Sequence, residues 1–350
     1  MVLNLHFKVL ASKLEWKPYE KYILSEDAEI TEDAALSLQA SENFREKILQ
    51  SAKVKDRIHR PRGTELAEQL LKSGQVAGID GTLSAYPTAT GARCRIGVVA
   101  VTYAGQSFAE AVYISSLHLA DQDLEDPVQL LEEAEELAKA SRLLFKALML
   151  YKERELALQR PEKWKLIHGP LVPLEMRLGR LGVSGALKAN LELAEKMLKR
   201  GNIAGVMSST SRLRLLNLGY LLRPGEYITA AKASAFMKAE KRRLTREEER
   251  LLDWFIEQHG DEITVSVYKA GSKAYVFEAP ANQVDEAASI IIADSRHTGM
   301  KGFPLLLDYA DKVASTLLSA EEFKQKFEQQ LLRAQGLEAI MSFDERRMRW

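Results

Sequence analysis

The sequence predicts an α/β protein in which a mixed sheet is flanked by helices, with helical extensions at both ends of the chain. Short β-branched runs alternate with long segments whose apolar residues recur every three or four positions, and both patterns together are typical of α/β folds. Two pairs of strand patterns are joined by short glycine-containing loops, as in antiparallel hairpins. We therefore divide the chain into an N-terminal helical extension (residues 1–70), one α/β domain (71–318) and a C-terminal helical tail (319–350).

The composition is that of a globular protein without a marked charge. The 350 residues are 46% hydrophobic and 28% charged, which is enough for a substantial core. The 49 basic and 49 acidic residues cancel, so any contact with nucleic acid must rest on a local patch. The single cysteine, Cys94, excludes an internal disulfide framework and a thiolate metal cluster. The N-terminus lacks a signal-peptide pattern, and no apolar run approaches the roughly 20 residues that span a bilayer, so we expect a cytoplasmic protein.

The N-terminal extension shows a helical pattern from residue 26 to residue 71. Within it lies a basic cluster that ends in proline and glycine and contains Arg57, Arg60 and Arg62. The cluster fits either a solvated helix end or a patch that contacts phosphates beside a site at Asp80.

The first strand of the predicted domain, residues 76–79, delivers Asp80 at its end. Two β-branched runs follow, residues 95–103 and 108–116, and form a predicted hairpin. A carboxylate just past a buried strand is costly to desolvate without a partner. A metal ion is one such partner, and Asp80 is therefore the first candidate for chemistry.

A long helix is predicted for residues 127–160, with two glutamates near its C-terminal end, where the helix dipole disfavours anions. Glu153 lies between Lys152 and Arg154 and is expected on the surface. Glu155 precedes an apolar run and is expected nearer the core. Because an inward carboxylate here would need a partner, we select Glu155 as a ligand candidate, with a solvated glutamate as the alternative.

Two further short strands also end in polar residues. Residues 165–167 are followed by His168 and a glycine, which places this imidazole at a strand end as a structural residue or as a metal ligand. Residues 203–207 run into a hydroxyl-rich segment followed by Arg212 and Arg214. That segment could contact phosphates or only cap a helix.

The C-terminal third combines charged helices with a second hairpin. Residues 232–258 alternate in charge and predict a helix with a solvated face, and residues 263–279 predict the hairpin. In the helix that follows Pro304, Asp308 and Asp311 are one turn apart and share a face. Either of them could be a ligand.

These candidates together predict an RNase H-like fold with a two-metal site. A strand carrying an aspartate, two antiparallel strands after it and scattered acidic residues are the parts of such a site. There, carboxylates hold two divalent ions roughly 4 Å apart, one to activate water and one to stabilise the leaving oxygen. Mg²⁺ and Mn²⁺ suit oxygen ligands, and Mn²⁺ tolerates an added imidazole. The candidate catalytic and metal-binding residues are Asp80, Glu155, His168 and Asp311.

Four motifs, in order, resemble the NurA family of nucleases over about residues 70 to 320. They are Gly78–Thr82, Ile167–Leu171, Ala204–Val206 and Gly302–Asp311. The resemblance implies an RNase H-like fold, Mn²⁺-dependent endo- and exonuclease activity in the processing of DNA ends, a homodimer and a hexameric HerA ATPase as partner. It also implies that Asp80 is the first catalytic aspartate, that Glu155 is the glutamate on the helix before the second motif, and that Asp311 closes the C-terminal motif.

The chain departs from the family pattern at two places. His168 stands where the family usually has an aspartate; a neutral imidazole can ligate Mn²⁺ but cannot bridge two ions as a carboxylate can. Ser208 and Ser209 stand where many members have a lysine. Two functions therefore stay open, namely an active DNA nuclease and a weakened NurA-like subunit that binds DNA or acts as a scaffold. A sugar-kinase or actin-like phosphate loop would need a second Asp-Gly loop and a Gly-rich adenosine motif, and the sequence contains neither.

Overall fold

The computed structural model describes residues 18–88, 91–105, 107–115, 127–209, 213–241 and 244–334. The chain forms two compact units, Met1–Asp56 and Arg57–Trp350. Where it is described, the first unit consists of helices α2 (Tyr19–Leu49) and α3 (Ala52–Lys55). The boundaries predicted at residues 70 and 318 stay predictions.

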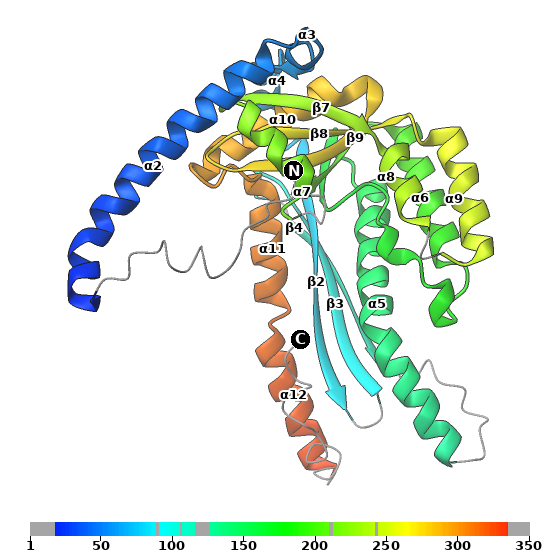
Figure 1. The fold of residues 1–350 in the computed structure, drawn as a ribbon. Helices are drawn as coiled ribbons and strands as arrows, with labels where there is room; N and C mark the ends of the chain where they lie inside the picture. Colours follow the sequence, from blue (N-terminus) through cyan, green and yellow to red (C-terminus); the bar gives the residue numbers. More distant parts are fainter. Residues whose placement is uncertain are drawn as a thin grey trace. The chain divides into compact units, whose positions relative to one another are not determined.

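The second unit is built on a mixed sheet, which has nine strands in the described part of the chain. Their order is β1-β7-β8-β9-β6-β5-β2-β3-β4, and only the neighbours β2–β5 and β5–β6 are parallel (Figure 1). The mixed sheet with its flanking helices confirms the predicted fold class. The strands are β1 (Ile58–His59), β2 (Val76–Thr88), β3 (Gly91–Val101), β4 (Ser107–Ser115), β5 (Trp164–His168), β6 (Ile203–Met207), β7 (Glu226–Lys232), β8 (Ile263–Lys269) and β9 (Ala274–Pro280).

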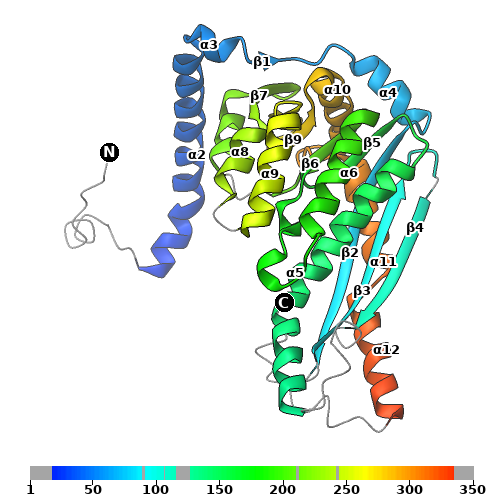
Figure 2. The same ribbon diagram turned by 90° about the vertical axis from the view of Figure 1, so that its right-hand side faces the viewer.

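Helices cover both faces of this sheet. Gly78 of β2 faces Leu306 of α11, whereas Gly81 faces Glu153 of α5, and because side chains alternate along a strand these two helices lie on opposite faces (Figure 2). The helices of the unit are α4 (Thr64–Lys72), α5 (Pro127–Gln159), α6 (Ala186–Arg200), α7 (Leu213–Leu216), α8 (Ala233–Ala239), α9 (Arg246–His259), α10 (Val284–Ser295), α11 (Leu305–Leu317) and α12 (Ala320–Arg333). Short 3-10 turns are η2 (Leu174–Met176), η3 (Gly179–Leu181), η4 (Asn217–Leu221), η6 (Ala281–Gln283) and η7 (Arg296–Thr298).

A large apolar core lies between the sheet and helices α4, α10 and α11. Ile291 of α10 and Leu307 of α11 are fully buried there against Val99 of β3, Val206 of β6 and Phe277 of β9. Since burying one such side chain contributes about 1.5–3 kcal/mol, this core fixes α11 against the strands that carry the polar residues discussed below.

The strand that holds Asp80 is longer than predicted. Residues 76–79 of β2 pair in parallel with β5, and the antiparallel pairing of β2 with β3 continues as far as Thr88. Asp80 therefore lies inside a strand, at the point where its parallel neighbour stops, and not just past a strand end. The prediction was wrong on this point because the hairpin partner β3 extends the strand beyond its apolar run.

Two segments predicted as continuous helices are divided. The helical pattern of residues 26–71 contains α2, α3, the short strand β1 and α4. The pattern of residues 232–258 is split into α8 and α9 by a capping box, in which the Thr245 hydroxyl accepts from the Glu248 N–H and the Glu248 carboxylate accepts from the Thr245 N–H. Strands β1 and β7 were not predicted.

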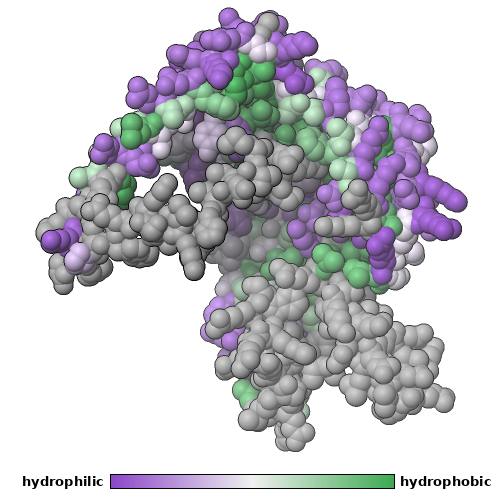
Figure 3. Space-filling model, in the orientation of Figure 1, coloured by the Kyte–Doolittle hydropathy of each residue, from purple (hydrophilic) through white to green (hydrophobic). Residues whose placement is uncertain are grey.

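The outward face of α9 is hydrophilic, as its alternating charges predicted. Hydrophilic residues cover the right-hand side of the view in Figure 3, where this helix lies. On the opposite side of α9, Leu252 and Phe255 are buried. None of the helices in the described part of the chain combines the length and the apolar character needed to cross a membrane.

A buried aspartate ties α10 to the start of α11. One oxygen of Asp294 accepts the Tyr103 hydroxyl at 2.5 Å, and the other accepts the Leu306 N–H at 3.0 Å. Burial raises the pKa of Asp294 to about 6, although both hydrogen bonds favour the charged form. A raised carboxyl pKa stabilises the fold below the ordinary value of 3.8, and that contribution is lost as the pH rises through about 6.

Replacing Asp294 with asparagine is therefore expected to flatten the pH dependence of stability. Between pH 4 and pH 7.5 the wild-type chain should lose up to ~3 kcal/mol more unfolding free energy than Asp294→Asn, at about 1.4 kcal/mol per pKa unit. Urea unfolding at several pH values measures this difference. Asp253→Asn, which changes a side chain that is 43% exposed, is the matched control. Equal slopes for Asp294→Asn and the wild type would contradict the role given to Asp294.

Candidate active site

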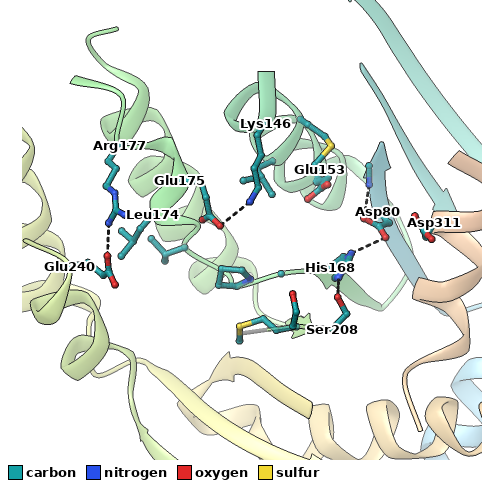
Figure 4. A pocket seen from close by; sticks show the side chains of 18 residues that line it. Asp80, Lys146, Glu153, His168, Leu174, Glu175, Arg177, Ser208, Glu240 and Asp311 are labelled. Carbon is teal, nitrogen blue, oxygen red and sulfur yellow. Dashed lines mark hydrogen bonds and ion pairs between the residues drawn. The ribbon is translucent and has the colours of Figure 1, made fainter. Parts of the chain in front are cut away.

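A cavity of about 500 Å³ opens where strands β5 and β6 end, beside Asp80 of β2 (Figure 4). Residues at the ends of adjacent parallel strands meet at one edge of a sheet, and here they are His168 of β5 and Ser208 after β6. Helix α5 adds Glu153 and α11 adds Asp311. Five polar side chains from five elements thus share one cavity.

Asp80, His168 and Ser208 form a hydrogen-bonded chain. The Nδ1 atom of His168 lies 2.9 Å from Oδ2 of Asp80, and its Nε2 atom lies 2.7 Å from Oγ of Ser208. The other oxygen of Asp80 accepts the N–H of Gly81 at 2.8 Å. Both ring nitrogens of the imidazole are therefore engaged, and its orientation is fixed (Figure 4).

The electrostatics of the cavity favour a charged imidazole at His168. Burial opposes the charge, but the hydrogen bond from His168 to Asp80 and the charges of Asp80, Glu153 and Asp311 outweigh it, so the pKa of His168 is raised. An imidazole that has taken up a proton cannot ligate a cation. Whether His168 binds metal thus depends on its protonation.

The backbone that follows His168 is held by hydrogen bonds and by close packing. The guanidinium of Arg154 donates to the carbonyl of Pro170 at 2.6 Å, and the N–H of Leu171 donates to the Glu278 carboxylate at 2.9 Å. Gly205 of β6 lets this segment approach closely, because a Cβ there would stand 2.4 Å from the carbonyl oxygen of Gly169. The glycine of the Ala204–Val206 motif therefore serves to place His168.

Glu153 is buried at the cavity wall, contrary to the prediction that it lies on the surface. Its side chain is 1% exposed, and Oε2 pairs with the fully buried Arg154 at 2.5 Å. Burial raises its pKa to about 7 and the charge of Asp80 adds to this, while Arg154 and His168 oppose the shift. Gly81 makes room for the carboxylate, since a Cβ there would meet Oε1 of Glu153 at 2.7 Å.

Glu155, the predicted ligand, is placed differently. Its side chain is 35% exposed and pairs with Lys152 at 2.7 Å, and it is not part of the cavity wall. Two residues along a helix turn the side chain by about 200°, so Glu153 and Glu155 cannot face the same way. The expectation that Glu155 lies nearer the core was wrong, because the buried side of α5 here carries Glu153, Arg154 and Leu156.

Asp311 faces the cavity and Asp308 does not. Burial raises the pKa of Asp311, and the nearby charge of Asp80 raises it further. Both carboxylate oxygens of Asp308 accept hydrogen bonds from Nζ of Lys301, at 2.7 and 2.6 Å. Of the two aspartates that share a helix face, Asp311 alone lines the cavity.

The donor types at this end of the cavity suit a divalent cation. Asp80, Glu153 and Asp311 supply carboxylate oxygens, which Mg²⁺ and Mn²⁺ prefer. Burial raises the pKa values of Glu153 and Asp311, and the charge of Asp80 raises them further. A cation would relieve this repulsion. Within the described residues, however, no three His, Cys, Asp or Glu side chains are grouped closely enough to hold an ion. The residue types therefore fit a metal, while Asp80 is hydrogen-bonded to His168 and Glu153 to Arg154.

The far end of the cavity was not predicted. There Lys146 pairs with Glu175 at 3.3 Å and Arg177 pairs with Glu240 at 2.7 Å (Figure 4). The sequence contained a signal for part of this end of the cavity. The α5 residues that line the cavity follow the spacing of a single helix face; they are Lys146, Met149, Leu150 and Glu153.

The predicted DNA contacts fall into two groups. Arg57, Arg60 and Arg62 are exposed around β1, at the sheet edge, and five strands lie between β1 and β2 in the sheet. The hypothesis that this cluster lies beside Asp80 is therefore wrong. Arg212 lies outside the described residues, and Arg214 belongs to α7, with no side-chain position described.

Fold and cavity together define a mixed α/β protein with a carboxylate-rich cavity at the ends of its parallel strands. No protein-family model and no curated protein matches the chain. Solved structures of NurA nucleases are similar to it over most of its length, at low sequence identity. The NurA nuclease from Sulfolobus solfataricus is 13% identical, with 91% of this chain and 98% of that chain covered and a TM-score of 0.47. A NurA bound to dAMP and manganese is 12% identical, with coverages of 81% and 92% and a TM-score of 0.45. An endonuclease V from Bacillus subtilis is 10% identical, with coverages of 72% and 82% and a TM-score of 0.33.

Proposed function

We propose that this protein is a nuclease that hydrolyses DNA phosphodiester bonds with the help of Mn²⁺ or Mg²⁺. The observation that carries the proposal is the convergence of Asp80, Glu153 and Asp311, with His168, on one cavity. Three of these four residues belong to the motifs that resemble the NurA family. A carboxylate-rich cavity repels a phosphodiester unless a cation is bound, which is why the proposal includes a metal.

Each residue has a distinct part in this proposal. Asp80, Glu153 and Asp311 would hold the cation, which supplies a polarised phosphoryl oxygen and an activated water when bound. His168, oriented by Asp80, holds a proton on Nε2 that it can give to a leaving oxygen. Arg154 keeps Glu153 and the backbone after His168 in place.

The partners of this function follow from the same resemblance. We propose that DNA is the substrate, that the chain forms a homodimer, and that a HerA-type hexameric ATPase delivers DNA ends to it. Arg212 and Arg214 stay candidates for phosphate contact, because they follow β6 and the cavity-lining Ser208 and Ser209. The scaffold alternative requires the same partners without cleavage.

Replacing Asp80 with alanine is expected to abolish cleavage of linear single- and double-stranded DNA in Mn²⁺. Asp80 links the metal site to His168, so its loss removes a ligand and releases the imidazole. Gel assays of the purified chain, with and without the ATPase, measure cleavage, and calorimetric titration with Mn²⁺ measures binding. Cleavage that survives in Asp80→Ala would contradict the site assignment. Absence of cleavage by the wild type even with the ATPase would favour the scaffold alternative.

A further inference from the structure

A second cavity of about 350 Å³ lies beside the candidate active site, and the two cavities share a wall. Met207, Ser208 and Ser209, at the end of β6, line both of them. Within this shared wall, Ser208 contacts His168 of the first cavity at 2.7 Å (Figure 4). The remaining walls of the second cavity come from the end of α7, from η4 and from the β8–β9 hairpin. A chain-like substrate that occupies the first cavity would therefore continue into the second.

The two cavities carry opposite charges. Among the described residues, the first is lined by five carboxylates and two cationic side chains. The second is lined by Lys269 and Lys273, and no described carboxylate contributes to its wall. In the described part of the chain, neither of these two ammonium groups is paired with a carboxylate elsewhere. Lysines placed in this way are suited to contact the phosphates of a nucleic acid backbone.

Both sides of the second cavity are held in place by close contacts. The turn η4 packs tightly on the start of β9, because a Cβ on Gly219 would collide with the Cβ of Ala274. The loop between β8 and β9 is tied to the segment before α11. There the N–H and the hydroxyl of Ser272 both donate to the carbonyl of Met300, at 2.9 and 2.7 Å. The cavity is thus formed before any ligand arrives, which lowers the cost of binding.

Tyr220 of η4 lines the second cavity and is 60% exposed. An exposed aromatic ring beside cationic side chains is the arrangement on which unpaired bases stack while the cations follow the backbone. The volume of about 350 Å³ lies near the lower end of the range of small-molecule pockets, roughly 300–1,000 Å³. The cavity therefore admits one nucleotide of a single strand and excludes a duplex, whose bases are stacked on each other.

We propose that the second cavity binds a neighbouring nucleotide of a single DNA strand whose scissile phosphate lies in the first cavity. Lys269 and Lys273 contact the phosphate of this nucleotide, and Tyr220 stacks on its base. The inference rests on the proposed nuclease function and adds to it the path of the substrate. It follows that the end of a duplex must be unpaired before one strand can reach Asp80.

Binding of a short fluorescein-labelled oligothymidylate to the full-length chain tests this path. Fluorescence anisotropy would be measured in Ca²⁺ between about 50 and 200 mM KCl, with a gel to confirm that the strand stays intact. Losing two phosphate contacts to a single strand lowers the slope of log K against log salt by about 1.4 and weakens binding roughly 25-fold at about 0.1 M salt. We expect this result for the double variant Lys269→Gln/Lys273→Gln. The matched control Lys163→Gln/Lys188→Gln changes two exposed lysines outside both cavities and should bind like the wild type.

Tyr220→Ala should weaken binding roughly 5- to 100-fold without changing the salt slope, and Tyr220→Phe, which keeps the ring, should bind like the wild type. Melting temperatures would confirm that every variant is folded. A lysine double variant with the wild-type slope, a strand that does not bind at all, or variants that weaken an oligothymidylate–oligoadenylate duplex as much as the strand would overturn the proposal.

Cleavage is measured separately, in gel assays of the same proteins in Mn²⁺. A chain that gives the expected binding results but cuts nothing would contradict the nuclease function and leave the strand-binding cavity in place. A wild type that cuts DNA while its lysine and tyrosine variants bind the strand unchanged would do the reverse.

Discussion

Replacing Glu153 with glutamine is expected to lower metal-dependent DNA cleavage by roughly a hundredfold or more, whereas Glu155→Gln should change it less than about twofold. The loss of a residue that only supports a metal ligand costs roughly 10- to 100-fold, and Glu153 is placed to be a ligand itself. Its carboxylate faces the cavity with Asp80 and Asp311, while that of Glu155 pairs with Lys152 outside the cavity wall. The two substitutions make the same chemical change in the same helix, two residues apart.

The pair of variants also separates catalysis from folding. Glutamine keeps an oxygen that can accept from Arg154, and Arg154 retains its bonds to the carbonyls of Leu150 and Pro170. Glu153→Gln should therefore melt close to the wild type, and calorimetry should show weakened Mn²⁺ binding. If Glu155→Gln lost activity while Glu153→Gln retained it, the ligand role would return to Glu155 and the cavity would not be the active site.

Local patterns in the sequence predicted the strands and helices well wherever the bounds of an element depend only on nearby residues. The β8–β9 hairpin, β6 and α5 lie within a residue or two of their predicted bounds, because each has one clear apolar period and a clear terminus. Strand β2 was predicted too short, because its continuation past Asp80 depends on pairing with β3, which comes later in the chain. The placement of the basic cluster at Arg57 failed for a related reason, since the order of strands in a sheet is not a local property.

The site was predicted only in part, because its composition also depends on contacts that are not local in the sequence. His168 was expected at a strand end and is found there, and the rule that parallel strand ends meet would also have brought Ser208 to it. The choice between Glu153 and Glu155 required the face of α5, which the spacing of Lys146, Leu150 and Glu153 contains but which flanking charges obscured. A glutamate between two cations resembles a surface residue until one of them, Arg154, proves to be buried with it.

Replacing Gly78 with alanine is expected to destabilise the second unit by at least ~2–3 kcal/mol and to abolish metal binding. A Cβ at this position would stand 2.6 Å from the carbonyl carbon and 2.7 Å from the carbonyl oxygen of Leu306. These are backbone atoms in the first turn of α11, which cannot turn aside as the end of a flexible side chain can. Overpacking of this kind costs about 1–3 kcal/mol, occasionally more, and here it must push α11 away from β2.

The functional consequence follows from the position of Asp311 on the same helix. Asp311 lies five residues after Leu306 in α11 and moves with it, so a helix displaced from β2 carries its carboxylate away from Asp80. Urea unfolding measures the stability, and Mn²⁺ titration under native conditions measures the site. Gly105→Ala is the control, because φ is +74° but no atom lies within 4 Å, so it bears only the backbone cost of about 1 kcal/mol. Equal unfolding midpoints for Gly78→Ala and the wild type would show that α11 tolerates a Cβ against β2. Asp311 would then owe its place in the cavity to contacts other than this glycine.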